Sequence, residues 1–143
     1  MLTVINPATG EAIAEMPTDT ADSIARAFQR ARAAQPAWAA TALSHRLACL
    51  RRFRDGIVRD TERLAAVLTS EVGKPICQSR NELAGLLGRL DFFLDATEAT
   101  LAPRTVFDEG GMRERISHEP LGVIANISAW NYPYFVGANV FVP

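Results

Sequence analysis

The residues that follow one apolar run of the sequence occupy a position typical of a ligand-binding site. Val123–Ile127 is short and largely β-branched, which predicts a buried parallel strand, and Asn131 follows it between Trp130 and Tyr132. The carboxyl end of such a strand, where it turns into a helix, is where open α/β sheets bind ligands. The residues alone favour a simpler explanation, in which Asn131 caps the next helix and the two aromatic side chains pack locally.

Other residues that often carry chemistry form no recognisable site. His45 and Cys49 stand four positions apart and share a helical face, but two ligands do not complete a zinc site, so no metal is expected. Cys49 and Cys77 both fall on predicted helices without an identified base, which indicates buried or inert thiols rather than nucleophiles. No glycine-rich phosphate loop is present, because Gly85 and Gly88 lie inside a leucine-rich helix.

The composition is that of one soluble globular domain. The chain has 143 residues, of which 48% are hydrophobic and 22% charged, and its formal net charge is -1. This balance gives no reason to expect nucleic acid or a membrane as partner. The start of the chain lacks the pattern of a secretory signal, and two cysteines without a CxxC pattern fit a reduced compartment. We therefore expect a cytoplasmic protein.

The elements that must position Asn131 are mainly helices. A turn at residues 6–11 predicts a small hairpin between 3–5 and 12–14. Thr20 is a predicted helix cap, and Pro36 is expected to end that first helix. Further helices are predicted from Ser44, where interleaved acidic residues indicate that the arginines face solvent, and over about 60–72.

In the second half of the chain, glycine and proline residues mark where the predicted helices begin and end. Gly73 permits a left-handed turn after the third helix, and Pro75 prevents the same helix from resuming. A stripe of leucines then predicts a long helix over about 76–101. Residues 113–119 have the mixed pattern of an edge strand, and Pro133 suits the first position of a last helix. Together these elements predict helices that cover one side of an incomplete α/β domain.

Three ordered segments resemble the amino-terminal part of the aldehyde dehydrogenase family. Glu119–Pro133, with the sequence EPLGVIANISAWNYP, is similar to the family segment that ends in WN(F/Y)P, although Ala129 replaces the proline often found before the tryptophan. Asn6–Glu11 resembles the family's opening hairpin, and Glu71–Pro75 its ExGKP helix junction. The resemblance implies an α/β fold over residues 1–143: the amino-terminal helical part and first strands of an incomplete cofactor-binding domain.

The same resemblance implies an enzyme that oxidises an aldehyde to a carboxylic acid with NAD or NADP, through a thiohemiacetal on a cysteine. Asn131 matches the family asparagine whose amide donates to the developing oxyanion, a role that suits a prepositioned neutral donor. Tyr132 and Val136 are candidates for the wall of the substrate tunnel. Four residues match the loop that lines the nicotinamide side of the cofactor cleft, largely through backbone contacts: Ile127, Ser128, Ala129 and Trp130.

The family's nucleophilic cysteine, general-base glutamate and cofactor-binding glycines all lie downstream of Pro143, so the chain is expected to be inactive by itself. Two hypotheses follow. The chain is the amino-terminal portion of an NAD(P)-dependent aldehyde dehydrogenase, or it is a noncatalytic family domain that acts as a helical interaction module. In both cases the edge of the predicted strand is uncovered, so downstream polypeptide or a second copy of the chain is the expected macromolecular partner.

Overall fold

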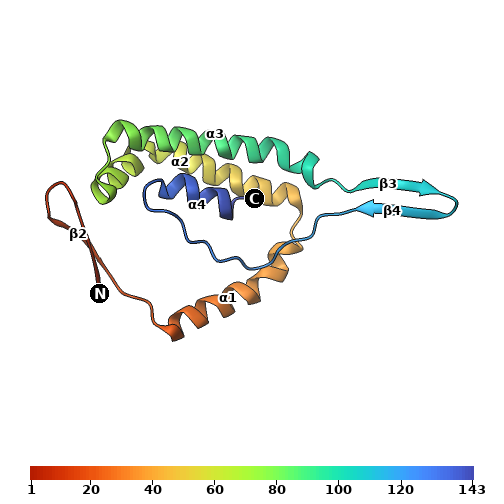
Figure 1. Ribbon diagram of the computed structural model, residues 1–143, viewed down its shortest axis with the longest axis horizontal. Helices are drawn as coiled ribbons and strands as arrows, with labels where there is room; N and C mark the ends of the chain where they lie inside the picture. The colour runs from red at the N-terminus through yellow and green to blue at the C-terminus, as the bar shows by residue number, and fades with distance from the viewer.

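The computed structural model describes residues 1–143 as a small helical body from which a helix and two hairpins extend (Figure 1). The elements in chain order are β1 (Leu2–Ile5), β2 (Ala12–Met16), α1 (Ala21–Ala39), α2 (Leu43–Val72), α3 (Ile76–Leu101), β3 (Arg104–Glu109), β4 (Met112–Ile116) and α4 (Pro133–Phe141). Helices α2 and α3 pack along each other, and α4 packs against α3. The prediction of a mainly helical chain with a small sheet component is confirmed.

The leucine stripe of α3 forms the centre of the core. Leu83 and Leu90 are completely buried, and Leu86 and Leu94 nearly so. The core cluster joins α2, α3 and the end of α4: Ile57, Ala65, Leu83, Leu86, Leu90, Ala138 and Val142. Helical spacing brings these leucines to one face of α3, so that face packs against both neighbouring helices.

Two ion pairs join α2 to α3 at the edge of this core. Arg54 binds Asp91 through two nitrogens, at 2.5 and 3.2 Å, and Arg80 binds Glu62, with its shortest contact at 2.7 Å. The prediction that the α2 arginines face solvent therefore does not describe Arg54, which binds a carboxylate of the next helix. Ion pairs that are at least partly exposed contribute little energy, so these two supplement the apolar packing of α2 against α3.

The opening hairpin is tied to the junction between α2 and α3. Strands β1 and β2 pair antiparallel around the predicted turn, in which the Asn6 carboxamide oxygen accepts a hydrogen bond from the Ala8 N–H at 2.9 Å. Gly73 ends α2 with the left-handed backbone predicted for it, at φ +78°. A Cβ atom at Gly73 would lie 2.6 Å from Cγ of Pro7. The two segments are therefore packed too closely for any side chain at position 73.

Two predicted helix boundaries are wrong. Pro36 does not end α1, which continues to Ala39. Proline removes its own N–H from the helix, but its carbonyl still accepts a hydrogen bond from the Ala40 N–H at 3.0 Å, which closes the last turn. The helices predicted from Ser44 and from Asp60 are one continuous helix, α2. Between these positions only Gly56 weakens the helix, and one glycine costs about 1 kcal/mol, which the tertiary packing of α2 offsets.

The predicted strand over Val123–Ile127 is also wrong. This segment belongs to no strand or helix, and Ile127 is 97% exposed. A parallel strand needs a neighbour to receive its hydrogen bonds, and both sheets of the chain are antiparallel hairpins. The sequence pattern also missed β3, which pairs with β4 around Gly110 and Gly111, both with positive φ as a tight hairpin turn requires.

The close approach of Gly73 to Pro7 generates a stability prediction. We expect Gly73→Ala to lower the free energy of unfolding by about 1–2 kcal/mol for the left-handed backbone and by about 1–3 kcal/mol more for the displaced proline ring. Gly10→Ala is the matched control, because Gly10 has a similar φ of +76° with no atom near its absent Cβ. Urea denaturation of both variants measures the difference. Equal losses would show that the Pro7 contact does not form in solution.

Candidate functional site

Asn131 lies at the mouth of a pocket between α3 and the start of α4. The pocket has a volume of about 430 Å³. Its lining residues come from the middle of α3 and from the turn that leads into α4: Asn81, Glu82, Gly85, Asn131, Tyr132, Phe135 and Val136. The structure thus brings together Asn131, Tyr132 and Val136, the residues that the sequence analysis assigned to oxyanion binding and to the tunnel wall.

The start of α4 is capped by a carboxylate from another helix. Pro133 occupies the first helical position as predicted, and Tyr132 at the N-cap position provides no side-chain hydrogen bond. Instead Oε1 of Glu82 accepts hydrogen bonds from the backbone N–H groups of Tyr134 and Phe135, at 2.9 and 3.1 Å. A negative charge is favourable at this end of a helix. The simpler explanation of Asn131 as the cap of α4 is therefore wrong.

Lys74 completes this buried arrangement. Its ammonium pairs with Oε2 of Glu82, and the side chains of Lys74 and Glu82 are only 9% and 0% exposed. The same ammonium donates to the backbone carbonyl of Asn131 at 2.8 Å and lies 4.1 Å from the centre of the Tyr132 ring. Buried charges require partners of this kind. Lys74 therefore connects the α2–α3 junction to the turn that carries Asn131.

Asn131 is held by its backbone carbonyl alone, and its side chain has no hydrogen-bond partner. Asn131 is an exposed residue, and its carboxamide makes no hydrogen bond within the chain. Its donor N–H groups are consequently available to a molecule in the pocket. Phe135 and Val136 give the pocket an apolar wall, since both are only partly exposed. The arrangement combines a neutral hydrogen-bond donor with an apolar surface, which suits an uncharged group that becomes polar during reaction.

The loop before Asn131 is attached to α4 by a residue that the sequence analysis overlooked. Nδ2 of Asn126 donates to the carbonyl of Gly137 at 3.0 Å, and the Ser128 hydroxyl donates to Oδ1 of Asn126 at 3.3 Å. A Cβ atom at Gly137 would lie 3.0 Å from Oγ of Ser128. These contacts fix where the loop crosses α4.

Between these attachments the loop faces solvent. Ile127 and Trp130 are 97% and 82% exposed, and Ala129 is exposed as well. The backbone N–H groups of residues 127–130 donate no hydrogen bond within the chain, while Trp130 and Asn131 form a turn. A segment that contacts a ligand through its backbone needs such free groups.

Lys74 and Glu82 were also not identified from the sequence as members of the site. Lys74 lies within the segment that resembles the ExGKP junction, so its position was noted without its role. Glu82 had a detectable signal, since it stands four residues before Leu86 and hence on the apolar face of α3. A charged residue in the middle of an apolar stripe indicates a buried partner.

The cysteines lie away from the pocket. Cys49 is partly buried on α2 and accepts a hydrogen bond from Arg52 at 3.0 Å, whereas Cys77 is exposed at the start of α3. Of the two alternatives expected for these thiols, buried or inert, burial therefore does not apply to Cys77. Both cysteines are free, and no group of three or more His, Cys, Asp or Glu side chains is placed to hold a metal ion. None of the helices has the length and apolar character that a membrane crossing requires.

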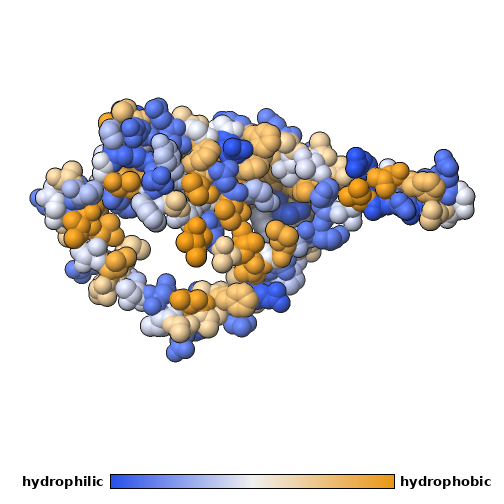
Figure 2. All heavy atoms as spheres, viewed as in Figure 1, coloured by the Kyte–Doolittle hydropathy of each residue, from blue (hydrophilic) through white to orange (hydrophobic).

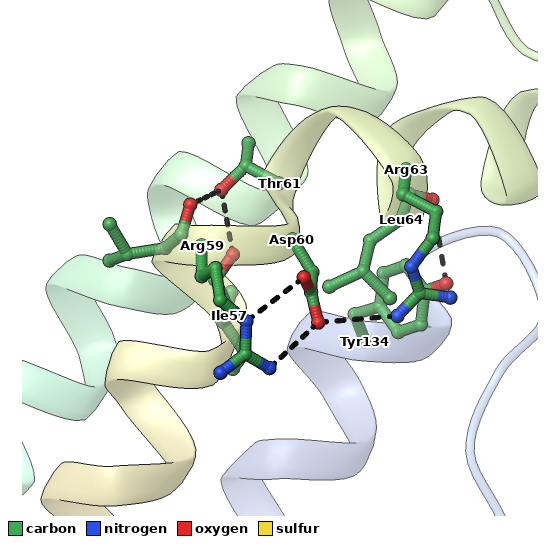
Figure 3. A network of polar contacts seen from close by, with 8 residues as sticks. Ile57, Arg59, Asp60, Thr61, Arg63, Leu64 and Tyr134 are labelled. Atoms are coloured by element: carbon green, nitrogen blue, oxygen red, sulfur yellow. Dashed lines mark hydrogen bonds and ion pairs between the residues drawn. The ribbon is translucent and has the colours of Figure 1, made fainter.

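A polar network on α2 borders the other side of α4 (Figure 3). Arg59 binds Asp60 at 3.1 Å and Arg63 binds the same carboxylate at 3.3 Å, so the Arg59 guanidinium, followed by Arg63, holds the pKa of Asp60 below its usual value. The Tyr134 hydroxyl lies 3.5 Å from the carbonyl of Leu64. The Tyr134 hydroxyl is thus the group through which the first turn of α4 contacts α2 here.

Comparison with known proteins places the whole chain in one group of enzymes. A model of the aldehyde dehydrogenase family matches residues 1–143. The chain is 34% identical to 3,6-anhydro-alpha-L-galactose dehydrogenase of Streptomyces coelicolor over 145 residues, which cover 99% of this chain and 29% of that protein. The chain spans only about 26–29% of the length of the curated relatives that it matches.

Solved structures of similar proteins share the fold. Aldehyde dehydrogenase 21 of Physcomitrella patens, solved with the reaction product succinate, superposes with a TM-score of 0.92 at 26% identity. The match covers 99% of this chain and 30% of that one. Succinic semialdehyde dehydrogenase of Streptococcus pyogenes, solved with NADP+, superposes with a TM-score of 0.89 over 98% of this chain and 31% of that one. Its identity of 23% supports the fold alone.

The environment of Tyr134 predicts a pH dependence of stability. Burial raises the pKa of Tyr134, and the carboxylates of Glu71 and Glu82 raise it further. The unfolded chain releases this proton near the ordinary value of about 10. The contribution to stability is therefore complete below pH about 10 and lost as the pH rises through the higher folded pKa.

We expect Tyr134→Phe to remove this part of the alkaline loss of stability, as measured by urea denaturation at a series of pH values above about 9. Tyr132→Phe, which leaves the Tyr134 hydroxyl in place, is the matched control and should retain the loss. An unchanged alkaline profile in Tyr134→Phe would contradict the assignment.

Proposed function

Because the chain belongs to the aldehyde dehydrogenase family, we propose that it forms the Asn131 side of the active site in an enzyme that oxidises an aldehyde to a carboxylic acid. The observation that carries the proposal is the position of Asn131, which stands at the mouth of the pocket with its carboxamide free and its backbone fixed by Lys74. Family resemblance assigns this residue to the oxyanion, and a carboxamide that lines the pocket without a partner in the chain supports that role.

In this proposal Asn131 stabilises charge on the substrate oxygen. A cysteine thiolate from the remainder of the enzyme attacks the aldehyde carbon and forms a thiohemiacetal, and the carbonyl oxygen becomes negative as the new C–S bond forms. The Asn131 Nδ2–H group donates a hydrogen bond to that oxygen. Because the hydrogen bond strengthens as the charge develops, it stabilises the transition state more than the ground state.

The loop from Ile127 to Trp130 would hold the nicotinamide part of NAD or NADP. Its free backbone N–H groups fit this role, since they can pair with a ligand without breaking any hydrogen bond of the chain. A nicotinamide held there would supply the hydride acceptor that oxidation of the aldehyde carbon requires. Ser128 and Asn126 hold the loop against α4. The loop therefore keeps a fixed position relative to α4, which begins two residues after Asn131.

Tyr132 and Val136 would contribute to the wall along which the aldehyde approaches. Both line the pocket beside Asn131, and Phe135 adjoins them. These side chains offer contact area without charge, which favours a substrate whose reacting end is neutral. The exposed and partly buried free cysteines fit a reduced compartment, so we place the enzyme in the cytoplasm.

The surface of the chain indicates that further protein covers it. A compact monomer of this mass exposes about 7,200 Å², whereas the chain of 15.6 kDa exposes 10232 Å². Apolar side chains gather along α1 and along the hairpin β3–β4 (Figure 2), and α1 has no buried residue. We infer that downstream polypeptide or a second copy of the chain covers this surface. The alternative, a noncatalytic interaction module, has the same surface but would not need a free carboxamide at Asn131.

We expect the isolated 143-residue chain to show no aldehyde dehydrogenase turnover, because an oxyanion donor does not replace the reacting thiolate. The assay uses several aldehydes with NAD and with NADP, and sedimentation of the same preparation shows whether the chain self-associates. Turnover that disappears in Cys49→Ser or Cys77→Ser would contradict the proposed division of the active site.

In the complete enzyme, Asn131→Ala should slow the chemical step by roughly 10²-fold or more, as the loss of an oxyanion donor does. The affinity for the cofactor should change less, because the loop backbone is untouched. Single-turnover measurement of reduced cofactor separates the two effects. Asn81→Ala is the matched control: it removes a carboxamide from the same pocket, on α3, and should leave the chemical step within a few-fold of the parent. An unimpaired chemical step in Asn131→Ala would exclude the proposed role.

A further inference from the structure

We propose that Lys74 and Glu82 are positioning residues that hold the backbone of Asn131 and the first turn of α4 together, and so set the direction of the Asn131 carboxamide. This inference rests on the proposed role of Asn131 in oxyanion binding. Neither residue acts on the substrate itself, because every polar atom of the two side chains that the structure places near the pocket is already engaged by the protein.

Glu82 is suited to fix α4 because its own position is rigid. Its neighbour Leu83 is completely buried in the core, and the Glu82 side chain has no exposed surface. One carboxylate oxygen accepts both free N–H groups at the start of α4, and the other oxygen accepts from Lys74. A buried carboxylate tolerates little departure from such geometry, since an unmade hydrogen bond to a buried charge is costly.

Lys74 is suited to fix the turn because it follows the packed Gly73 directly. An ammonium has three donor hydrogens, and here it meets three groups: the Glu82 carboxylate, the Asn131 carbonyl and the face of the Tyr132 ring. The carbonyl contact is the one hydrogen bond that holds Asn131. The position of the backbone from which the exposed carboxamide projects therefore depends on a lysine that lies 57 positions earlier in the sequence.

A small displacement of Asn131 would have a large effect on the rate of the reaction. A displacement of about 1 Å at a reacting centre can cost 10²-fold in rate. Glu82→Gln keeps the shape of the side chain but removes the charge that attracts both Lys74 and the start of α4. The Asn131 carbonyl then loses a well-placed donor, while the pocket and the loop 127–130 keep all of their residues.

The test is a double-mutant cycle in the complete enzyme. Glu82→Gln should slow single-turnover hydride transfer by about 10- to 100-fold and leave the KM for the cofactor within about 3-fold. In the Asn131→Ala background, Glu82→Gln should add less than about 3-fold, because a residue that acts through Asn131 has no effect once the carboxamide is gone. Glu62→Gln removes the carboxylate of the exposed Glu62–Arg80 pair and is the matched control, expected to leave the rate unchanged.

Backbone hydrogen exchange provides a readout that does not depend on activity. The amides of Tyr134 and Phe135 should exchange at least about 10-fold faster in Glu82→Gln than in the parent or in Glu62→Gln. Should Glu82→Gln fail to fold, Lys74→Met combined with Glu82→Gln removes both charges together and leaves no unpaired buried ion. This pair should show the same loss of rate and the same dependence on Asn131.

The outcomes separate the two proposals. If Asn131→Ala leaves the chemical step intact, the proposed function fails, and the positioning role fails with it. Suppose instead that Asn131→Ala slows the chemical step. The positioning role alone is then overturned if Glu82→Gln leaves the rate of hydride transfer unchanged, or if it lowers that rate equally with alanine and with asparagine at position 131. Unchanged exchange at Tyr134 and Phe135 would likewise overturn it, because the cap would then not hold α4.

Discussion

The buried carboxylate of Glu82 is the constraint on which the site depends. A charge enclosed by apolar helices must be fully paired, and the groups that pair it come from two places in the chain: Lys74 at the junction after α2 and the backbone N–H groups at the start of α4. Lys74 in turn donates to the backbone carbonyl of Asn131. Because Glu82 belongs to the leucine face of α3, these groups are brought to the core of the protein. The pocket then forms beside the capped helix start.

The same junction explains why three distant segments belong together. Pro7 of the opening hairpin packs on Gly73, Gly73 turns the chain so that Lys74 follows, and Lys74 binds the carbonyl of Asn131. Each segment is short and would not hold its shape alone. Through these contacts, Gly73 and Lys74 together support the backbone of Asn131, whose carboxamide is a hydrogen-bond donor at the surface.

The helices that carry the site are packed together, whereas other elements of the chain are left uncovered. Helices α2, α3 and α4 share one core, and every residue proposed to position Asn131 is attached to that core. Helix α1, the hairpin β3–β4 and the segment before Ile127 contribute little to it. Their exposed apolar side chains suit contact with further protein, so the chain combines a site fixed to the core with apolar surfaces that its own elements leave uncovered.

The sequence by itself determined the local features and the family. Glycine and proline marked the end of α2 and the start of α4, the leucine stripe identified α3, and the WNYP segment pointed to Asn131. It could not reveal that Val123–Ile127 is unpaired, because β-branched residues favour an extended backbone whether or not a neighbouring strand is present. Nor could it show that a glutamate on α3, rather than Asn131, caps α4. Only the tertiary structure decided this, since a cap that comes from 52 residues away depends on how the helices pack and not on local spacing.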